Sequence, residues 1–403
     1  MCRLNNLIVT DAQSRIFGFL SSKINVDFVA FVTYNIVSQR HVYYMKLATK
    51  PKAKLIIVAI MHLLTDAIGI SVILPFADGQ YFLRFSDGQI DGVWLIIIYT
   101  FCAFGLQPFF GLILDSVKRY TPFLYTSAVI MALQSVYVVF SPLLAAVCLG
   151  IGNAMFHVAG GGVAIYTDSK AWNLGVFVAP GAIGLALGMC FYETHHTYIY
   201  RGLMLFMILV MLVFRFRDDE YIVRTKKDFE QHRGEHILPI PFVLLLVAVL
   251  IRGFGGSLPQ FSFSVDTGWK IGMACAVAFG KFIGGFLTDK IGVNKATLFM
   301  LVPSCFMLAF GSGIPALAIL GVVLFNTTMP TTLYLTTKVL PAYKNFGFGI
   351  VALMLMVGSY TAFAVLTLTE FKWYVFLPVV LVSVACIIIS EYLLRRKNDE
   401  LLS

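Results

Sequence analysis

Five ionisable residues of this 403-residue chain lie inside long runs of apolar side chains. His62 and Asp66 are four positions apart, so a helix would place both on one face. The other three are His157, Arg252 and Lys281. An ionised group at the centre of a bilayer costs about 2.5–3.5 kcal/mol, so residues of this kind are candidates for a functional role.

The chemistry available to these residues is proton binding and anion binding. A carboxyl group beside an imidazole can take up and release a proton, since histidine titrates near neutral pH. Arg252 and Lys281 could hold an anionic group or neutralise Asp66. Structural alternatives are that Arg252 extends to the outer interface, that His157 is a hydrogen-bonded structural residue and that Lys281 bridges helices. The Asp66 side chain is too short to reach an interface.

The elements that carry these residues are predicted to be membrane-spanning helices. The chain is 59% hydrophobic and 13% charged, whereas a soluble domain has about 25% charged residues. Backbone groups in lipid must pair within their own segment, which favours helices of about 20 residues. Twelve segments qualify, at 53–76, 92–114, 121–140, 142–166, 171–191, 198–214, 237–256, 269–288, 296–311, 314–336, 346–368 and 373–394.

The charged residues between these segments predict the topology and the domains. Lys and Arg number 20 in one alternating set of loops and four in the other, which places the first set and both termini in the cytoplasm. The longest polar stretch separates six spans from six. We predict an N-terminal cytoplasmic extension (1–52, interfacial or a gene-model artefact), a six-helix bundle (53–214), a cytoplasmic linker (215–236), a second six-helix bundle (237–394) and a cytoplasmic tail (395–403).

Several classes of function are disfavoured. The net charge of +9 comes mostly from loops that orient a membrane protein, so no nucleic-acid partner is expected. The seven cysteines have neither metal-ligand nor redox spacing. No His/Asp cluster with metal spacing, nucleophile–base arrangement or phosphate-binding Gly-x-x-x-x-Gly-Lys motif is recognisable. We therefore expect neither an enzyme nor a bound metal or cofactor.

A glycine followed four positions later by an aspartate occurs once in each half, where an apolar run meets a basic loop. The copies are Gly111-Leu-Ile-Leu-Asp115-Ser-Val-Lys-Arg119 and Gly285-Phe-Leu-Thr-Asp289-Lys290-Ile-Gly292. The glycine permits close helix contact, and the aspartate can accept hydrogen bonds from a neighbouring helix N-terminus. Lys118, Arg119 and Lys290 could pair with it. The alternative is an incidental acid in a basic loop, but two equivalent copies favour a cytoplasmic gate.

The repeat resembles the loop signature of the major facilitator superfamily, Gly-x-Leu-Ala-Asp-Arg-x-Gly-Arg-Lys. The second copy matches at Gly285, Leu287, Asp289 and Gly292, with Lys290 in place of Arg. The first matches at Gly111, Asp115 and Arg119, with Lys118 in place of the second glycine. This resemblance implies an all-α membrane fold of two six-helix bundles, with alternating access to a central site.

A glycine-rich stretch in the fifth span resembles a motif of the drug and proton antiporters of that superfamily, Gly-x-x-x-Gly-Pro-x-x-Gly-Gly. Its residues are Gly175, Pro180, Gly181, Gly184 and Gly188. Ala179 and Ile183 stand where the motif has glycines. Helix packing alone is the alternative explanation, because glycines provide a smooth surface for close contact.

Two further stretches resemble the fosmidomycin-resistance branch, which has His-x-x-x-Asp in span 1 and Gly-x-x-Phe-Phe-His-Pro in span 4. Here they are His62-Leu-Leu-Thr-Asp66 and Gly152-Asn153-Ala154-Met155-Phe156-His157-Val158. Val158 replaces the proline and Met155 the first phenylalanine. The resemblance does not carry the drug substrate with it.

The sequence therefore predicts a secondary transporter that exports a small organic compound in exchange for protons. The alternative is an importer or exchanger of an organic anion that uses Arg252 and Lys281. We expect a monomer in the plasma membrane, in contact with lipid and a small-molecule substrate, with a proton gradient as the driving force.

Overall fold

The computed structural model describes residues 50–77, 92–192, 196–213, 216–217, 219–232, 239–258, 261, 263, 266–311, 313–368 and 376–402. Every regular element in these ranges is a helix, which confirms the all-α prediction. The predicted extension lies outside the described residues up to position 49, so its interfacial character stays a prediction.

The first half of the chain forms an array of helices that follows the predicted spans. Its elements are α3 (Pro51–Ala77), α4 (Gly92–Thr100), the π-helix η2 (Phe101–Gly105), α5 (Gln107–Val117), α6 (Tyr120–Ala132), α7 (Gln134–Phe140), α8 (Pro142–Asp168), α9 (Ala171–Phe191) and α10 (His196–Val213). Together α4, η2 and α5 form one span, whereas α6 and α7 are bent by 53° at their junction.

The second half repeats the pattern after a helical linker, α11 (Asp219–Gln231). Its elements are α12 (Pro239–Ser257), α13 (Thr267–Ile291), α14 (Val293–Phe310), α15 (Pro315–Asn326), α16 (Thr328–Val339), α17 (Lys344–Leu368) and α18 (Phe376–Leu402). Among the described residues, ten helices are long and apolar enough to span a bilayer. The bent pair and the shorter apolar helix Thr197–Val213 occupy the remaining two predicted segments.

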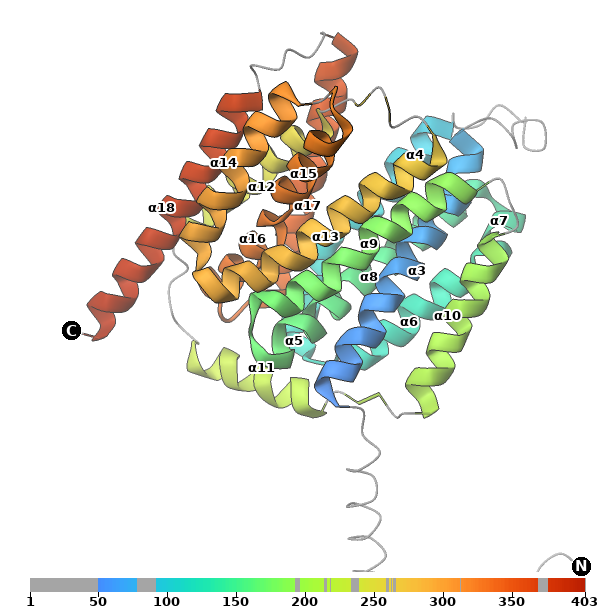
Figure 1. Ribbon diagram of the computed structural model, residues 1–403. Coiled ribbons are helices and arrows are strands. Elements are labelled where there is room, and N and C mark those ends of the chain that lie inside the picture. The colour runs from blue at the N-terminus through green and yellow to red at the C-terminus, as the bar shows by residue number, and fades with distance from the viewer. Residues whose placement is uncertain are drawn as a thin grey trace, which may run out of the picture. The chain divides into compact units, whose positions relative to one another are not determined.

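The linker helix α11 lies across one end of the spanning helices, next to α8 (Figure 1). We call this end of the molecule the linker end. Both loop motifs lie there, because α5 and α13 end at Val117 and Ile291. The α11 helix carries most of the charge of the predicted linker and has an apolar stripe that includes the fully buried Tyr221.

Helix α9 packs between α3 of its own half and α13 of the other half (Figure 1). Glycines make both contacts possible. A Cβ on Gly184 would overlap the backbone of Leu63 in α3, and one on Gly175 would lie 2.8 Å from the carbonyl oxygen of Lys281 in α13. Spans 1, 5 and 8 are thereby brought side by side, and the ionisable residues that they carry approach one another.

Candidate functional site

Asp66 lies between two histidines from different helices. Its Oδ2 is 3.3 Å from Nε2 of His62, one turn earlier on α3, and its Oδ1 is 3.5 Å from Nε2 of His157 on α8. The two imidazole rings meet edge to face, with centroids 4.4 Å apart. Both histidines are buried, so the three groups form one polar cluster in an apolar interior. The structure thus adds His157 of α8 to the His62–Asp66 pair that the sequence predicted.

The other nitrogen of each imidazole is fixed by a backbone carbonyl. His62 Nδ1 lies 2.7 Å from the carbonyl oxygen of Phe177, and His157 Nδ1 lies 2.9 Å from that of Asn153. A carbonyl oxygen can only accept a hydrogen bond, so each Nδ1 must carry the proton. In the neutral tautomer both Nε2 atoms are then bare, and both face the carboxyl group of Asp66.

Polar and small neighbours complete the surroundings of Asp66. The Asn153 amide donates to Asp66 Oδ1 and to the Tyr99 hydroxyl, at 3.2 Å in each case. Gly181 provides the space for the carboxyl group, because a Cβ there would lie 2.7 Å from Asp66 Oδ2. The span-5 glycines therefore do more than bring helices together, since one of them lies directly against the charged cluster.

The cluster also has the composition of a metal site. His62, Asp66 and His157 each offer one ligand atom, and these atoms lie within 4.8 Å of one another. Metal-binding histidines usually donate their second N–H to a carbonyl or carboxylate, as both do here. The sequence prediction of no metal-type cluster overlooked this set, because its members come from two helices. The cation Lys281, which interacts electrostatically with Asp66 and His157, opposes a divalent ion.

The second half contributes two cations, Arg252 and Lys281, to the interior of the helix array. Arg252 on α12 is only 5% exposed, so it does not extend to the outer interface. Its Nε and Nη2 atoms are buried without a hydrogen-bond partner in the described part of the chain. Lys281 on α13 is close enough to interact electrostatically with Arg252 and with Asp66. A buried guanidinium with unused donors is a site for an anion.

Both loop-motif aspartates cap a helix of the opposite half. Asp289 accepts hydrogen bonds from the backbone N–H groups of Ala171 (3.0 Å) and Trp172 (2.9 Å), at the start of α9. Asp115 accepts from the N–H groups of Asn345 (3.2 Å) and Phe346 (2.9 Å), at the start of α17. Each aspartate thus satisfies otherwise unpaired donors and faces the positive end of a helix dipole.

The motif glycines lie at the same two crossings. Cβ atoms on Gly111 and Gly285 would lie 2.6 Å from the Asn345 oxygen and 2.5 Å from the Ala171 oxygen, respectively. Gly292 ends α13 with φ +84°, a left-handed value that favours glycine. Of the predicted ionic partners, Lys118 interacts electrostatically with Asp115, whereas Arg119 is exposed and Lys290 lies over the Phe286 ring at 5.7 Å.

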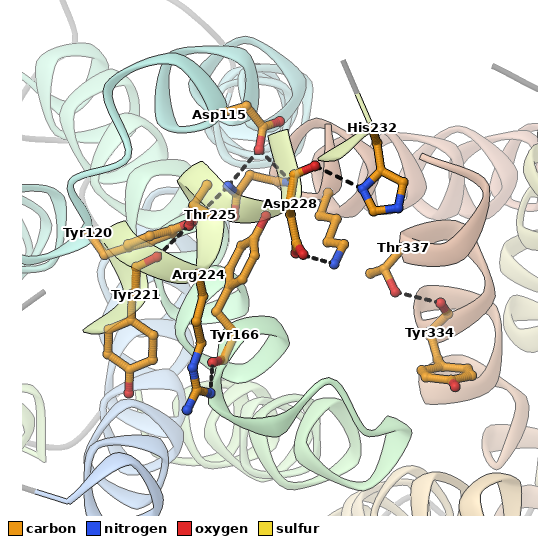
Figure 2. A network of polar contacts seen from close by, with 12 residues as sticks. Asp115, Tyr120, Tyr166, Tyr221, Arg224, Thr225, Asp228, His232, Tyr334 and Thr337 are labelled. Atoms are coloured by element: carbon orange, nitrogen blue, oxygen red, sulfur yellow. Dashed lines mark hydrogen bonds and ion pairs between the residues drawn. The ribbon is translucent and has the colours of Figure 1, made fainter. Parts of the chain in front are cut away.

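The linker helix adds contacts that the sequence did not suggest. Figure 2 shows Thr225, Arg224 and Asp228 of α11 directed at residues of the surrounding helices. Arg224 donates to the carbonyls of Tyr166 and Thr167 at the end of α8, and Thr225 meets the Tyr120 hydroxyl at 3.1 Å. These contacts attach the linker to the first half.

On its other side the linker reaches the second half. Asp228 forms an ion pair of 2.5 Å with Lys344, the first residue of α17 (Figure 2). Asn345, the next residue, donates its amide to Asp115 at 2.7 Å and to the Tyr120 hydroxyl at 3.0 Å. Sequence reasoning missed Asn345, Lys344 and Asp228. Lys344 and Asp228 could have been noticed in the sequence, because one is a basic residue near the start of a predicted span and the other is an acidic residue in the linker.

Comparison with known proteins supports the fold and leaves the family open. No protein-family model matches the sequence, and no curated protein sequence matches it. A variant of the fucose:proton symporter FucP of E. coli superposes with a TM-score of 0.58 over 84% of this chain and 97% of its own, at 13% identity. FucP in an outward conformation, described as a major facilitator superfamily transporter, gives 0.55 over 82% and 97%, at 12% identity. The chain therefore has the major facilitator fold.

Proposed function

We propose that this membrane protein with the major facilitator fold is a secondary transporter that exports a small organic compound in exchange for protons. The observation that carries the proposal is the cluster of Asp66, His62 and His157. Both Nδ1–H groups are used by backbone carbonyls, so each contact between Nε2 and the carboxyl group needs a proton of its own.

The number of protons that the cluster holds determines whether its contacts are favourable. With Asp66 ionised and both imidazoles neutral, two nitrogen lone pairs face two carboxylate oxygens, at 3.3 and 3.5 Å. One added proton makes one of these contacts a hydrogen bond, and a second makes both favourable. A proton in the contact between His157 and Asp66 therefore stabilises the packing of α3 against α8, and its release weakens that packing. A site of this kind can couple protonation to helix movement.

The loop-motif aspartates are the proposed gate of the alternating-access cycle. In this structure the linker end is held together by contacts of Asp115 and Asp289 with helices of the opposite half. The loop charges predict that this end faces the cytoplasm, and we propose the plasma membrane as the protein's location. The structure then corresponds to an inward-closed state, and the opposite state requires the four N–H contacts to break.

Proton coupling is tested in proteoliposomes that contain a pH-sensitive dye. A thermal-shift screen of small organic compounds first supplies a ligand, because binding to the folded state raises its apparent stability. Flux of that ligand should change the pH of the lumen, and Asp66→Asn should abolish the change. Asp399→Asn, in the exposed C-terminal tail, is the matched control. Normal, gradient-insensitive flux in Asp66→Asn would falsify proton coupling.

The second candidate function is import or exchange of an organic anion. It is favoured by Arg252, whose two buried nitrogens lack partners in the described part of the chain, and by the neighbouring Lys281. An anion bound there would supply the missing counter-charge close to the proton cluster. Arg252→Ala and Lys281→Ala should each reduce anion transport at least tenfold, by loss of a charge-assisted hydrogen bond worth about 1.5–3 kcal/mol. Unchanged anion transport in both variants rejects this candidate.

A further inference from the structure

We propose that the cargo is an amphipathic organic anion, with its charged head at Arg252 and Lys281 and its apolar body in a cavity one helix turn away. The proposal rests on the anion-binding role argued above and narrows it to a chemical class. Three observations carry it. Two guanidinium nitrogens of Arg252 lack a partner in the described part of the chain, an apolar cavity lies nearby, and α12 and α13 each place a cation four residues from a residue that lines this cavity.

The cavity measures about 330 Å³ and lies on the far side of the cations from the linker end. Its volume falls at the lower end of the range for small-ligand sites, about 300–1,000 Å³. Both halves of the chain contribute to it. Most lining side chains are apolar, and they include Met189, Met273, Val277, Leu308, Val322 and Phe325.

Two helices connect the cations to this cavity. On α12, Gly256 lines the cavity and Arg252 lies four residues earlier. On α13, Val277 lines it and Lys281 lies four residues later. Residues four apart share a helix face and are separated by about 6 Å along the axis. The two helices run in opposite directions, so both cations lie on the linker-end side of the cavity. One further cation, Lys270, is among the residues that line the cavity.

This arrangement selects against two simpler ligands. A neutral apolar molecule would leave the Arg252 donors unpaired in an apolar interior, which is costly. A small hydrophilic anion would satisfy the donors and leave the cavity without an apolar occupant. A carboxylate joined to a hydrocarbon chain does both, and each buried CH₂ group improves binding by about fourfold.

The experiment is equilibrium binding of radiolabelled octanoate to the full chain in lipid nanodiscs, with empty nanodiscs to subtract partition into lipid. Octanoate should bind saturably, and acetate should compete at least about tenfold more weakly, because it has the head without the chain. Val277→Trp fills the cavity and should weaken octanoate at least tenfold. Phe279→Trp, which is 57% exposed on the same helix, is the matched control and should bind as the wild type does.

The outcomes distinguish a wrong anion site from a wrong class of ligand. If acetate competes as well as octanoate and Arg252→Gln abolishes both, the anion site stands and the amphipathic class is wrong. If octanoate binds equally well to Arg252→Gln, the anion site itself is wrong. If Val277→Trp binds octanoate normally, or if the wild type shows no saturable binding, the cavity is not the site of the apolar body and the proposal fails. Proton coupling at Asp66 is tested independently of all these results.

Discussion

Asp115 and Asp289 occupy equivalent places in the two halves and cap equivalent helices, yet their surroundings differ. Asp289 is exposed, and its hydrogen bonds come from two backbone N–H groups. Asp115 is 2% exposed and accepts, in addition to two N–H groups, the side-chain amide of Asn345. Through Tyr120 and Thr225 that network continues into the linker helix.

The two copies of the loop motif also differ in backbone conformation at the position of the second glycine. The second copy keeps the glycine that ends α13, and Gly292 has φ +84° and ψ +161°, a region open almost only to glycine. The first copy has Lys118 there, at φ +60° and ψ +27°, a left-handed conformation that other residues reach at a cost. A fuller signature therefore reflects a stricter backbone turn, whereas the weaker signature accompanies the more buried and more connected aspartate.

Removal of the buried aspartate should have the largest effect. Asp115→Ala leaves two backbone N–H groups and the Asn345 amide without their acceptor. The loss of charge-assisted hydrogen bonds costs about 2–3 kcal/mol, so the amides at the start of α17 should exchange with deuterium at least about 30-fold faster. Hydrogen–deuterium exchange of peptides that contain Phe346 measures this. Unchanged exchange would mean that the crossing is held by helix packing alone.

Substitution of Gly292, in the turn after α13, should have the second-largest effect on stability. Gly292→Ala forces a Cβ into a conformation that is strained by roughly 1–3 kcal/mol, although the space around it is open. A lowered unfolding temperature in detergent is the expected result. Gly268→Ala is the matched control, because that site is also open and its φ is ordinary. An equal loss in both variants would contradict the backbone explanation.

Removal of the exposed aspartate should have a smaller effect than removal of the buried one. Asp289→Ala deletes a helix cap, which is worth about 1 kcal/mol. Amides of Ala171 and Trp172 should therefore exchange about fivefold faster, in the same type of measurement as for Asp115→Ala. The ranking of the two copies by burial is wrong if exchange at the start of α9 in Asp289→Ala increases more than exchange at the start of α17 in Asp115→Ala.

The smallest effect is expected at Lys118. Lys118→Gly removes left-handed strain of about 1–2 kcal/mol, but the more flexible unfolded chain offsets about 0.5–1 kcal/mol of that gain. The unfolding temperature should rise slightly. A clear fall would show that the Lys118 side chain makes a stabilising contact that outweighs its backbone strain.

The same contrast between halves applies to the buried charges. Asp66 in the first half is surrounded by His62, His157 and Asn153, which all come from its own half. In the second half, the Nε and Nη2 atoms of Arg252 have no hydrogen-bond partner among the described residues. Sequence reasoning identified all of these ionisable residues, because any charge in an apolar run is conspicuous. It gave no sign of which were satisfied, since the partners come from other helices.

The helices and their spans, the loop charges that predict the orientation, and the two loop motifs can all be read from the sequence alone. The spans follow from local composition, because lipid requires each segment to be apolar and to satisfy its own backbone hydrogen bonds. Three contacts could not be predicted from the sequence and are known only from the folded structure. Asp66 contacts His157, Asp115 caps α17, and Asp228 pairs with Lys344, 116 positions away. Such contacts depend on which helix faces pack together, and the near-uniform apolar surfaces of these helices leave that choice to glycine positions and long-range fit.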